Sequence, residues 1–365
     1  MKKILLIGPI LRNLTLFREE LIFRLCHEGY SVSLLGHYDE IPEKFKNKGI
    51  EFLNMPLDRK GKNPVTDALQ ILKYRTIIKK SKPDIVLTYT TKPSAYAGIA
   101  CVTLRIPYIA NNSGLVDTRY AHQGLKHILR FIYWFGFRWA SHIMYQNSYE
   151  QTYINGCLHK NVPNSLIPGS GVNLDKFIYT PYPSEEEGII FNYVARVEKI
   201  KGIEEFLECA SCIKLKYKNA RFIIYGNFDQ STYRAVVEKK VNEGIIEYGG
   251  IQSNMLPYIQ KAHAVIHPSY YEGMTNVVLE HSAVGRVCIG SDIPGVNDGI
   301  DDGITGYTFP VKDVNALISR VEKFILTPNS EKAKMGYAAR LKMEREFDRN
   351  IVVNKYLSII EQILK

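Results

Sequence analysis

The sequence predicts an α/β protein with two Rossmann-like domains, each built on a parallel sheet. Short apolar runs alternate with amphipathic stretches of helical length along nearly the whole chain, which is the rhythm of β-α-β units. The chain has 365 residues, enough for two domains of about 150 to 200 residues with a core each. A linker at residues 166–173 separates two such series, so we expect domains at 1–170 and 171–348.

The first series begins directly at the start of the chain. An apolar run at residues 4–7 predicts a strand that Gly8 and Pro9 end, so residues 8–13 are expected to form a loop. The elements expected next are, in order, a helix at 18–27, strands at 31–35 and 50–53, a basic helix at 64–80, and strands at 85–89 and 107–110.

The second series contains the most informative stretch of the chain, residues 264–291. An apolar strand at 264–267 stops at Pro268, and a polar loop with a glycine follows. Residues 276–284 read as a short helix closed by Gly285, and residues 287–291 as a second buried strand. Because ligands bind at the carboxyl ends of strands in this architecture, we expect the loop after Pro268 to carry a site.

The start of that helix suits a nucleoside diphosphate. Free N–H groups and the positive end of the helix dipole attract phosphate. Glu280, about one turn into the helix, can accept hydrogen bonds from ribose hydroxyls, and Glu272 can reach a sugar ring. Both carboxylates also fit plain structural roles, with Glu280 complementing the helix dipole and Glu272 as a solvated loop charge. The residues expected to contact the donor here are Gly273, Thr275, Asn276 and Val277.

Two cations lie in a second loop of this domain. A strand from Phe191 delivers Arg196 to its C-terminal end, and the following turn presents Lys201. Two cations at such a place can neutralise a diphosphate leaving group, and Arg can do so with two parallel hydrogen bonds. Considered singly, each is equally an ordinary surface charge.

Three sequence motifs in the second half of the chain resemble those of a known family. The string P-S-Y-x-E-G-x-x-x-x-x-L-E at residues 268–280, the S-D-I-P-G turn at 291–295 and D-G-x-x-G at 302–306 closely resemble family 4 retaining GT-B glycosyltransferases. The resemblance implies a GT-B fold, in which two Rossmann-like domains face each other across a cleft and a C-terminal helix, here 349–365, crosses back to the N-terminal domain. It also implies transfer of a sugar from a nucleotide sugar, with retention of configuration and usually without a metal.

The resemblance further implies roles for single residues. Glu280 would contact the ribose and Glu272 the donor sugar, while R-x4-KG with Arg196 and Lys201 is similar to the family's phosphate-binding motif. The nucleobase would lie near residues 226–252, where Gly226 lets a nucleotide approach. We therefore expect Glu272, Arg196 and Lys201 to be the catalytic residues, and 171–348 to be the nucleotide-sugar domain.

The first domain resembles acceptor-binding domains of the same family, with departures. Related enzymes often place two glycines in the first loop, where this chain has only Gly8 for contact with donor phosphate. Many have a His near residues 111–115, where this chain offers Asn112 or Ser113. The Phe17-Arg18 pair and Lys92 in T-K-P-S resemble the subgroup that acts on polyprenyl-diphosphate-linked sugars, so Arg18 and Lys92 are acceptor candidates.

Residues 119–145 are expected to form one helix that mixes cations and aromatic rings. Such a helix is either an interfacial membrane site or a core helix whose cations snorkel. Residues 1–170 hold 23 Lys and Arg against 12 Asp and Glu, a net charge of +11, while the remainder has a net charge of −1. This excess favours contact with an anionic membrane. The residues concerned are Arg119, Lys126, Arg130, Phe131, Tyr133, Trp134, Phe135, Phe137, Arg138 and Trp139.

Composition and missing motifs narrow the choice of function. Six scattered cysteines are typical of reduced cytosolic thiols, and neither a signal peptide nor an 18-residue apolar run is present. We expect a cytoplasmic protein, peripheral to the inner face of the membrane, with no nucleic-acid partner, no D-x-D metal motif and no cofactor beyond a UDP-sugar substrate. A non-hydrolysing nucleotide-sugar epimerase of the same fold is the alternative enzyme, and a catalytically silent sugar-nucleotide or glycolipid binding module is the alternative outside enzymes.

Overall fold

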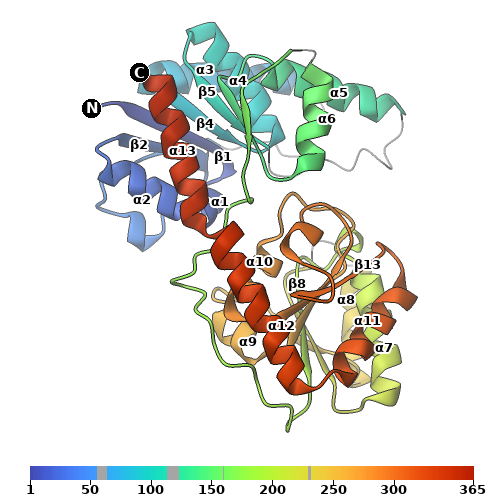
Figure 1. Cartoon of the computed structure of the whole chain (residues 1–365). Coiled ribbons are helices and arrows are strands. Elements are labelled where there is room, and N and C mark those ends of the chain that lie inside the picture. The colour runs from blue at the N-terminus through green and yellow to red at the C-terminus, as the bar shows by residue number, and fades with distance from the viewer. Residues whose placement is uncertain (56–63, 113–122, 159, 229–231) are drawn as a thin grey trace. The chain divides into compact units, whose positions relative to one another are not determined.

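A computed structural model describes residues 1–55, 64–112, 123–158, 160–228 and 232–365, without the side chains of 64–65, 123–126 and 128–129. The chain divides into two compact units (Figure 1). Unit 1 comprises Met1–Ser170 together with Asn350–Lys365, and unit 2 comprises Gly171–Arg349. Both are α/β units with a parallel sheet, as the sequence predicts.

Unit 1 has a seven-stranded parallel sheet in the order β3-β2-β1-β4-β5-β6-β7. The order reverses direction between β1 and β4, which is the place where doubly wound folds bind ligands. The strands are β1 (Lys3–Ile10), β2 (Ser31–His37), β3 (Glu51–Asn54), β4 (Ile85–Tyr89), β5 (Tyr108–Asn111), β6 (His142–Tyr145) and β7 (Asn164–Leu166). The helices are α1 (Leu11–Phe17), α2 (Glu19–His27), α3 (Pro64–Ser81), α4 (Thr91–Leu104), α5 (Gln123–Phe137), α6 (Ser148–Leu158) and α13 (Arg349–Leu364).

Helices cover both faces of this sheet because its strands are apolar on both sides. Along β1, Ile4 and Leu6 face the core shared with α1, α2 and α13, while Leu5 and Ile7 face the core shared with helices α3 to α6. This alternation is the two-residue period of a strand buried on both faces. The final helix therefore belongs to the core of unit 1, where Tyr356 is fully buried.

Two expectations for unit 1 are wrong. Residues 8–13 are not a loop, since β1 continues to Ile10 and α1 starts at Leu11. Gly8 is buried within the strand, and a Cβ there would lie 2.9 Å from Leu14 Cγ, so helix packing accounts for this glycine. Residues 119–145 are not one helix, because α5 ends at Phe137 and residues 142–145 form β6, which pairs with β5.

Unit 2 has a six-stranded parallel sheet in the order β10-β9-β8-β11-β12-β13. The strands are β8 (Ile190–Val194), β9 (Arg221–Tyr225), β10 (Glu247–Gly250), β11 (Ala264–His267), β12 (Val287–Ser291) and β13 (Gly306–Phe309). The helices are α7 (Ile203–Lys216), α8 (Thr232–Asn242), α9 (Leu256–Lys261), α10 (Asn276–Val284), α11 (Val314–Leu326) and α12 (Asn329–Lys342).

The core of unit 2 also has two sides. Phe191 of β8 packs with Phe206 of α7 and Phe324 of α11 on one face of the sheet. On the other face, Val265 of β11 packs against Val278 of α10. These two cores fix α10 and the loop before it at the carboxyl end of β11.

Candidate active site

The loop between β11 and α10 ends at an open helix N-terminus in unit 2. Thr275 occupies the N-cap position without a side-chain cap hydrogen bond, and the first turn of α10 carries no acidic residue. The Thr275 N–H donates instead to the Gly295 carbonyl at 3.0 Å. The amides of Asn276 and Val277 therefore begin a helix whose positive end is not neutralised from its own sequence.

Glu272 in this loop forms the centre of a partly buried polar cluster. Its Oε1 accepts hydrogen bonds from Lys201 Nζ at 2.6 Å and Ser269 Oγ at 2.7 Å, and lies 3.2 Å from His267 Nε2. The Lys201 and Glu272 side chains are each 16% exposed. Glu272 is thus not a solvated loop charge. Its partners Lys201, His267 and Ser269 could not be predicted from the sequence pattern, because the Lys201 contact joins residues 71 positions apart.

The environment of Glu272 keeps it ionised. Burial alone would raise the pKa of this carboxyl, but the hydrogen bond with His267 and the charge of Lys201 outweigh burial and lower the pKa to about 2. At neutral pH the carboxylate is charged and fixed by three neighbours, which leaves it able to accept a hydrogen bond from a sugar hydroxyl.

Two glycines allow the loops of this site to touch through their backbones. Gly202 has φ +71°, and a Cβ there would lie 2.1 Å from the Pro268 carbonyl oxygen. A Cβ on Gly295 would lie 2.3 Å from the Gly273 carbonyl oxygen. Close backbone approach is the physical reason for the glycine that ends R-x4-KG and for the one that ends S-D-I-P-G.

Arg196 and Lys201 are joined through a tyrosine of the strand that precedes them. The Tyr193 hydroxyl donates to the carbonyl oxygens of Arg196 at 3.3 Å and Lys201 at 3.1 Å. The Arg196 side chain is 49% exposed and forms an ion pair with Glu198 at 2.7 Å. This role of Tyr193 could not be predicted from the sequence, because Tyr193 lies in an apolar strand pattern in which a buried Tyr resembles any other core residue.

Glu280 lies on α10, partly buried, one turn after the helix begins. Burial raises the pKa of its carboxyl to about 7, although the charges of Lys176 and Arg349 act in the opposite direction. The unliganded protein therefore holds Glu280 near the midpoint of its titration at neutral pH. A ligand that donates hydrogen bonds to this group shifts it toward the carboxylate.

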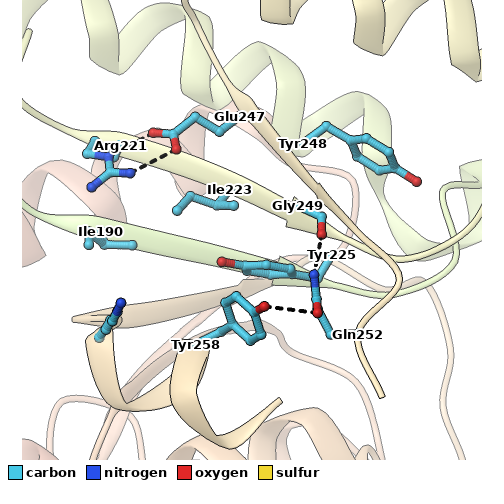
Figure 2. Close-up of a pocket in the computed structure, with 10 residues that line it drawn as sticks. Ile190, Arg221, Ile223, Tyr225, Glu247, Tyr248, Gly249, Gln252 and Tyr258 are labelled. Carbon is cyan, nitrogen blue, oxygen red and sulfur yellow. Dashed lines mark hydrogen bonds and ion pairs between the residues drawn. The ribbon is translucent and has the colours of Figure 1, made fainter. Parts of the chain in front are cut away.

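A cavity of about 380 Å³ lies beside β8, β9 and β10 (Figure 2). Its lining includes residues 247–249 and 252 of the stretch to which the resemblance assigns the nucleobase, but also Ile190 and Arg221, the first residues of β8 and β9. The rings of Tyr225 and Tyr258 are 4.9 Å apart within it. Tyr258 Oη donates to Gln252 Oε1 at 2.9 Å, and Gln252 Nε2 donates to the Gly249 carbonyl at 2.6 Å, so the amide orientation is fixed (Figure 2).

Gly226 follows β9 at one end of this region. A Cβ there would lie 1.8 Å from the Ala195 carbonyl oxygen, so the neighbouring strand already requires glycine at this position. The Tyr248 hydroxyl donates to the Gly226 carbonyl at 2.7 Å, which occupies that carbonyl.

The candidates of unit 1 occupy the carboxyl ends of its central strands. Arg18 joins α1 to α2, and Asn112 directly follows β5, with its Oδ1 accepting a hydrogen bond from Thr91 Oγ1 at 3.4 Å. Lys92 lies 3.9 Å from Asp67 in an ion pair. Ser113 lies outside the described residues, as does Arg119.

Comparison with known proteins places the chain in a family. Residues 3–147 match the model of "Glycosyl transferase 4-like" proteins, and residues 188–326 match "Glycosyl transferases group 1". The chain belongs to the family 4-like glycosyltransferases. Both models describe glycosyltransferases, so the epimerase alternative has no support.

Curated relatives and solved structures extend the comparison. A Campylobacter jejuni protein named N,N'-diacetylbacillosaminyl-diphospho-undecaprenol alpha-1,3-N-acetylgalactosaminyltransferase is 25% identical, over 96% of each chain. An Escherichia coli UDP-Gal:alpha-D-GlcNAc-diphosphoundecaprenol alpha-1,3-galactosyltransferase is 23% identical over 70% of each chain. Anabaena HepE, solved with UDP and glucose, has a TM-score of 0.79 at 13% identity and covers 99% of this glycosyltransferase and 100% of its own chain. The fold is the GT-B fold of such enzymes.

Within the described residues, no group of three His, Cys, Asp or Glu side chains is placed to hold a metal ion. None of the described helices is both long and apolar enough to span a bilayer.

Proposed function

We propose that this glycosyltransferase moves a hexosyl or N-acetylhexosaminyl group from a UDP-sugar to a polyprenyl-diphosphate-linked glycan intermediate of bacterial surface polysaccharide synthesis, with retention of configuration. The observation that carries the proposal is the ion pair, 16% exposed at each side chain, between Lys201, just before α7, and Glu272, in the loop before the open N-terminus of α10. The acceptor class comes from the similarity to the two undecaprenol-diphosphate enzymes.

Each group of unit 2 then has a defined task. Arg196, Lys201 and the first amides of α10 bind the diphosphate and stabilise the charge that develops when the sugar C1–O bond breaks. Glu280 accepts hydrogen bonds from the ribose, and Glu272 accepts one from a hydroxyl of the donor sugar. The acceptor hydroxyl forms the new C1–O bond on the same face, and its proton passes to the departing diphosphate.

Side-chain cations replace a metal ion in this scheme. Lys201 and Arg196 supply positive charge where other enzymes use Mg²⁺, so transfer is expected to continue at its full rate in excess EDTA. Complete loss of transfer in EDTA, restored by a divalent ion, would assign the charge stabilisation to a metal instead.

We place the enzyme on the inner face of the cytoplasmic membrane through the end of α5. Phe131 is 60% exposed there, and the Arg138 guanidinium lies 4.1 Å from the Trp134 ring centroid and 4.2 Å from that of Trp139. Exposed rings combined with a cation are typical of a headgroup-level contact. The anionic leaflet would supply the lipid-linked acceptor.

Incubation with a panel of UDP-sugars and a synthetic polyprenyl-diphosphate N-acetylhexosamine tests the proposal. A lipid product extended by one sugar with an α linkage, analysed by mass spectrometry and NMR, is expected. An isomerised UDP-sugar formed without acceptor, or donor binding with no product for any sugar, would contradict it.

A further inference from the structure

Arg18 in unit 1 is a buried cation without an acidic partner. Its side chain is 5% exposed, Nη1 donates to the Phe17 carbonyl at 3.1 Å, and the guanidinium lies 4.9 Å from the Tyr89 ring centroid. Among the described residues no carboxylate forms an ion pair with it, and its Nε has no hydrogen-bond partner. A buried charge left in this state is unfavourable unless an anion joins it.

Two further polar groups, at the carboxyl ends of β4 and β5, are also unsatisfied in the described structure. The Tyr89 hydroxyl, at the end of β4, and Asn112 Nδ2, just after β5, are buried without a hydrogen-bond partner in the described structure. The Tyr356 hydroxyl of α13 donates to Oδ1 of Asn111, the residue before Asn112. Every unsatisfied atom of Arg18, Tyr89 and Asn112 can donate a hydrogen bond.

The N-terminus of α4 lies at the same place. This helix of 14 residues starts at Thr91, whose hydroxyl contacts Asn112, and it has neither a side-chain cap nor an acidic residue in its first turn. Its N-cap residue, Thr90, has φ +71°, a strained value for a non-glycine residue of the kind that accumulates at ligand sites. Thr90 and Thr91 are partly exposed, so solvent reaches this end of the group.

The position in the sheet supports a ligand site. Arg18 follows α1, the helix that begins directly after β1, and Tyr89 ends β4; the strand order of unit 1 reverses between β1 and β4. A cation, an open helix N-terminus and several unsatisfied donors together match an anion with many acceptor oxygens, which is the chemistry of a phosphate or diphosphate.

We propose that Arg18, Tyr89, Asn112 and the N-terminus of α4 form a diphosphate-binding site, which we name the Arg18 site, and that it holds the diphosphate of the lipid-linked acceptor. The choice of the acceptor rests on the proposed function, whereas the anion chemistry rests on the unsatisfied groups alone. Tyr356 positions the site through Asn111.

The test uses Arg18→Met in the full-length protein, with Arg24→Met as the matched control. Arg24 lies in α2, has a 51% exposed side chain and pairs with Glu28 at 2.8 Å. Thermal unfolding is measured with UDP at saturation, to occupy unit 2, and with or without inorganic pyrophosphate. Pyrophosphate is expected to raise the melting temperature of the wild type and of Arg24→Met, but not of Arg18→Met.

The melting temperature of Arg18→Met distinguishes an anion-binding role from a purely structural one, because loss of a structural Arg18 would lower it. Arg18→Met removes an uncompensated charge, so without pyrophosphate it is expected to melt at or above the wild-type temperature. An Arg18→Met protein that melts several degrees lower and keeps the pyrophosphate shift would overturn the proposal.

Enzyme kinetics tests the Arg18 site independently of the proposed function. Arg18→Met is expected to raise the KM for the polyprenyl-diphosphate acceptor about tenfold or more, the usual effect of losing a charged hydrogen bond, while the Kd for UDP stays within about twofold. Unchanged KM with active transfer refutes the Arg18 site and leaves the function standing. An Arg18-dependent pyrophosphate shift without any transfer refutes the function and leaves the anion site standing.

Discussion

In unit 2, the Lys201 ammonium is paired with Glu272 at 2.6 Å before any ligand arrives, whereas in unit 1 the Arg18 guanidinium is buried with no carboxylate beside it in the described structure. The loops of unit 2 are held by direct backbone contacts at Gly202 and Gly295. In unit 1, by contrast, the buried polar atoms Arg18 Nε and Asn112 Nδ2 have no hydrogen-bond partner among the described residues.

This difference teaches that one protein can prepare two binding sites in opposite ways. The Lys201 site is preorganised, so its geometry costs little to reach when charge develops in the transition state. The Arg18 site leaves its charge to be neutralised by a ligand, so the ligand contributes to the stability of the fold. The two sites should therefore respond to the loss of their cation with changes of stability in opposite directions.

The largest expected effect is that of Lys201→Ala. Removing this ammonium takes away charge stabilisation of the leaving diphosphate, so kcat/KM should fall by about 10² or more. It also leaves buried Glu272 without its cation, which should reduce the free energy of unfolding by on the order of 3 kcal/mol. Steady-state kinetics and urea unfolding measure the two quantities. Arg196→Ala should lower kcat/KM by a similar factor, and it also removes the cation paired with Glu198, whose side chain is only 9% exposed.

Lys199→Ala is the control for Lys201→Ala. Lys199 lies two residues away, is 63% exposed and pairs with Glu204 at 3.2 Å, so its loss should change neither quantity measurably. If Lys201→Ala kept near-normal kcat/KM in a folded protein, the assignment of the phosphate site would be wrong. If it raised stability, the contrast between the two units would disappear.

The second prediction concerns acid and uses Glu272. The pKa of this carboxyl falls from an ordinary 4.5 to about 2 on folding, so its ionised form stabilises the native state above pH 4.5. That contribution, about 3 kcal/mol, should be lost as pH falls from about 4.5 to about 2. Urea unfolding between pH 5.5 and pH 3 should show this slope in the wild type and a shallower one in Glu272→Gln. Equal slopes would mean that the Lys201 pair contributes nothing to stability.

The elements of unit 2 that carry the site were predictable from sequence because their signals are local. The helix at Asn276–Val284, with Gly285 after it, and the strands on either side have the predicted bounds. In unit 1, α1 was missed because Gly8 and Pro9 usually end a strand, whereas here β1 runs through them and Leu14 packs on Gly8.

The pairing of charges could not be predicted, because it depends on contacts through space. Arg196, Lys201 and Glu272 were each expected at the site, but not that Lys201 would bind Glu272 over 71 residues of separation. Arg18 was expected as an acceptor candidate, but burial without a counter-ion is a property of the folded chain. Tyr356 lies 245 residues from Asn111, and nothing in its own helix pattern marks it.

The third prediction distinguishes the roles of the two carboxylates Glu272 and Glu280. Glu280→Ala should weaken UDP binding by about tenfold through lost ribose hydrogen bonds, whereas Glu272→Ala should also lower kcat because it contacts the reacting sugar. The pKa of Glu280 is raised to about 7, so the carboxylate forms as pH rises from 6 to 8 and UDP affinity should rise with it. Calorimetry measures UDP affinity against pH for the wild type and for Glu280→Gln. The titration of the UDP phosphate affects both proteins equally, so the difference between the two profiles is the contribution of Glu280. Parallel pH profiles for the two proteins would return Glu280 to a structural role at the helix N-terminus.

The smallest expected effect concerns membrane binding. It would add a further difference between the two units, because unit 1 and not unit 2 would contact lipid. Each well-placed cation contributes roughly 1 kcal/mol at an anionic surface, so Arg130→Glu with Arg138→Glu should reduce sedimentation with phosphatidylglycerol liposomes strongly, without changing UDP binding by unit 2. Wild-type sedimentation should weaken as salt rises through the physiological range and be slight with phosphatidylcholine alone. The control carries the same change of charge in unit 2, Lys214→Glu with Lys239→Glu, and should sediment like the wild type. If both double variants bound liposomes equally, net charge rather than the aromatic end of α5 would govern adhesion, and the exposed Phe131 would have to meet something other than lipid.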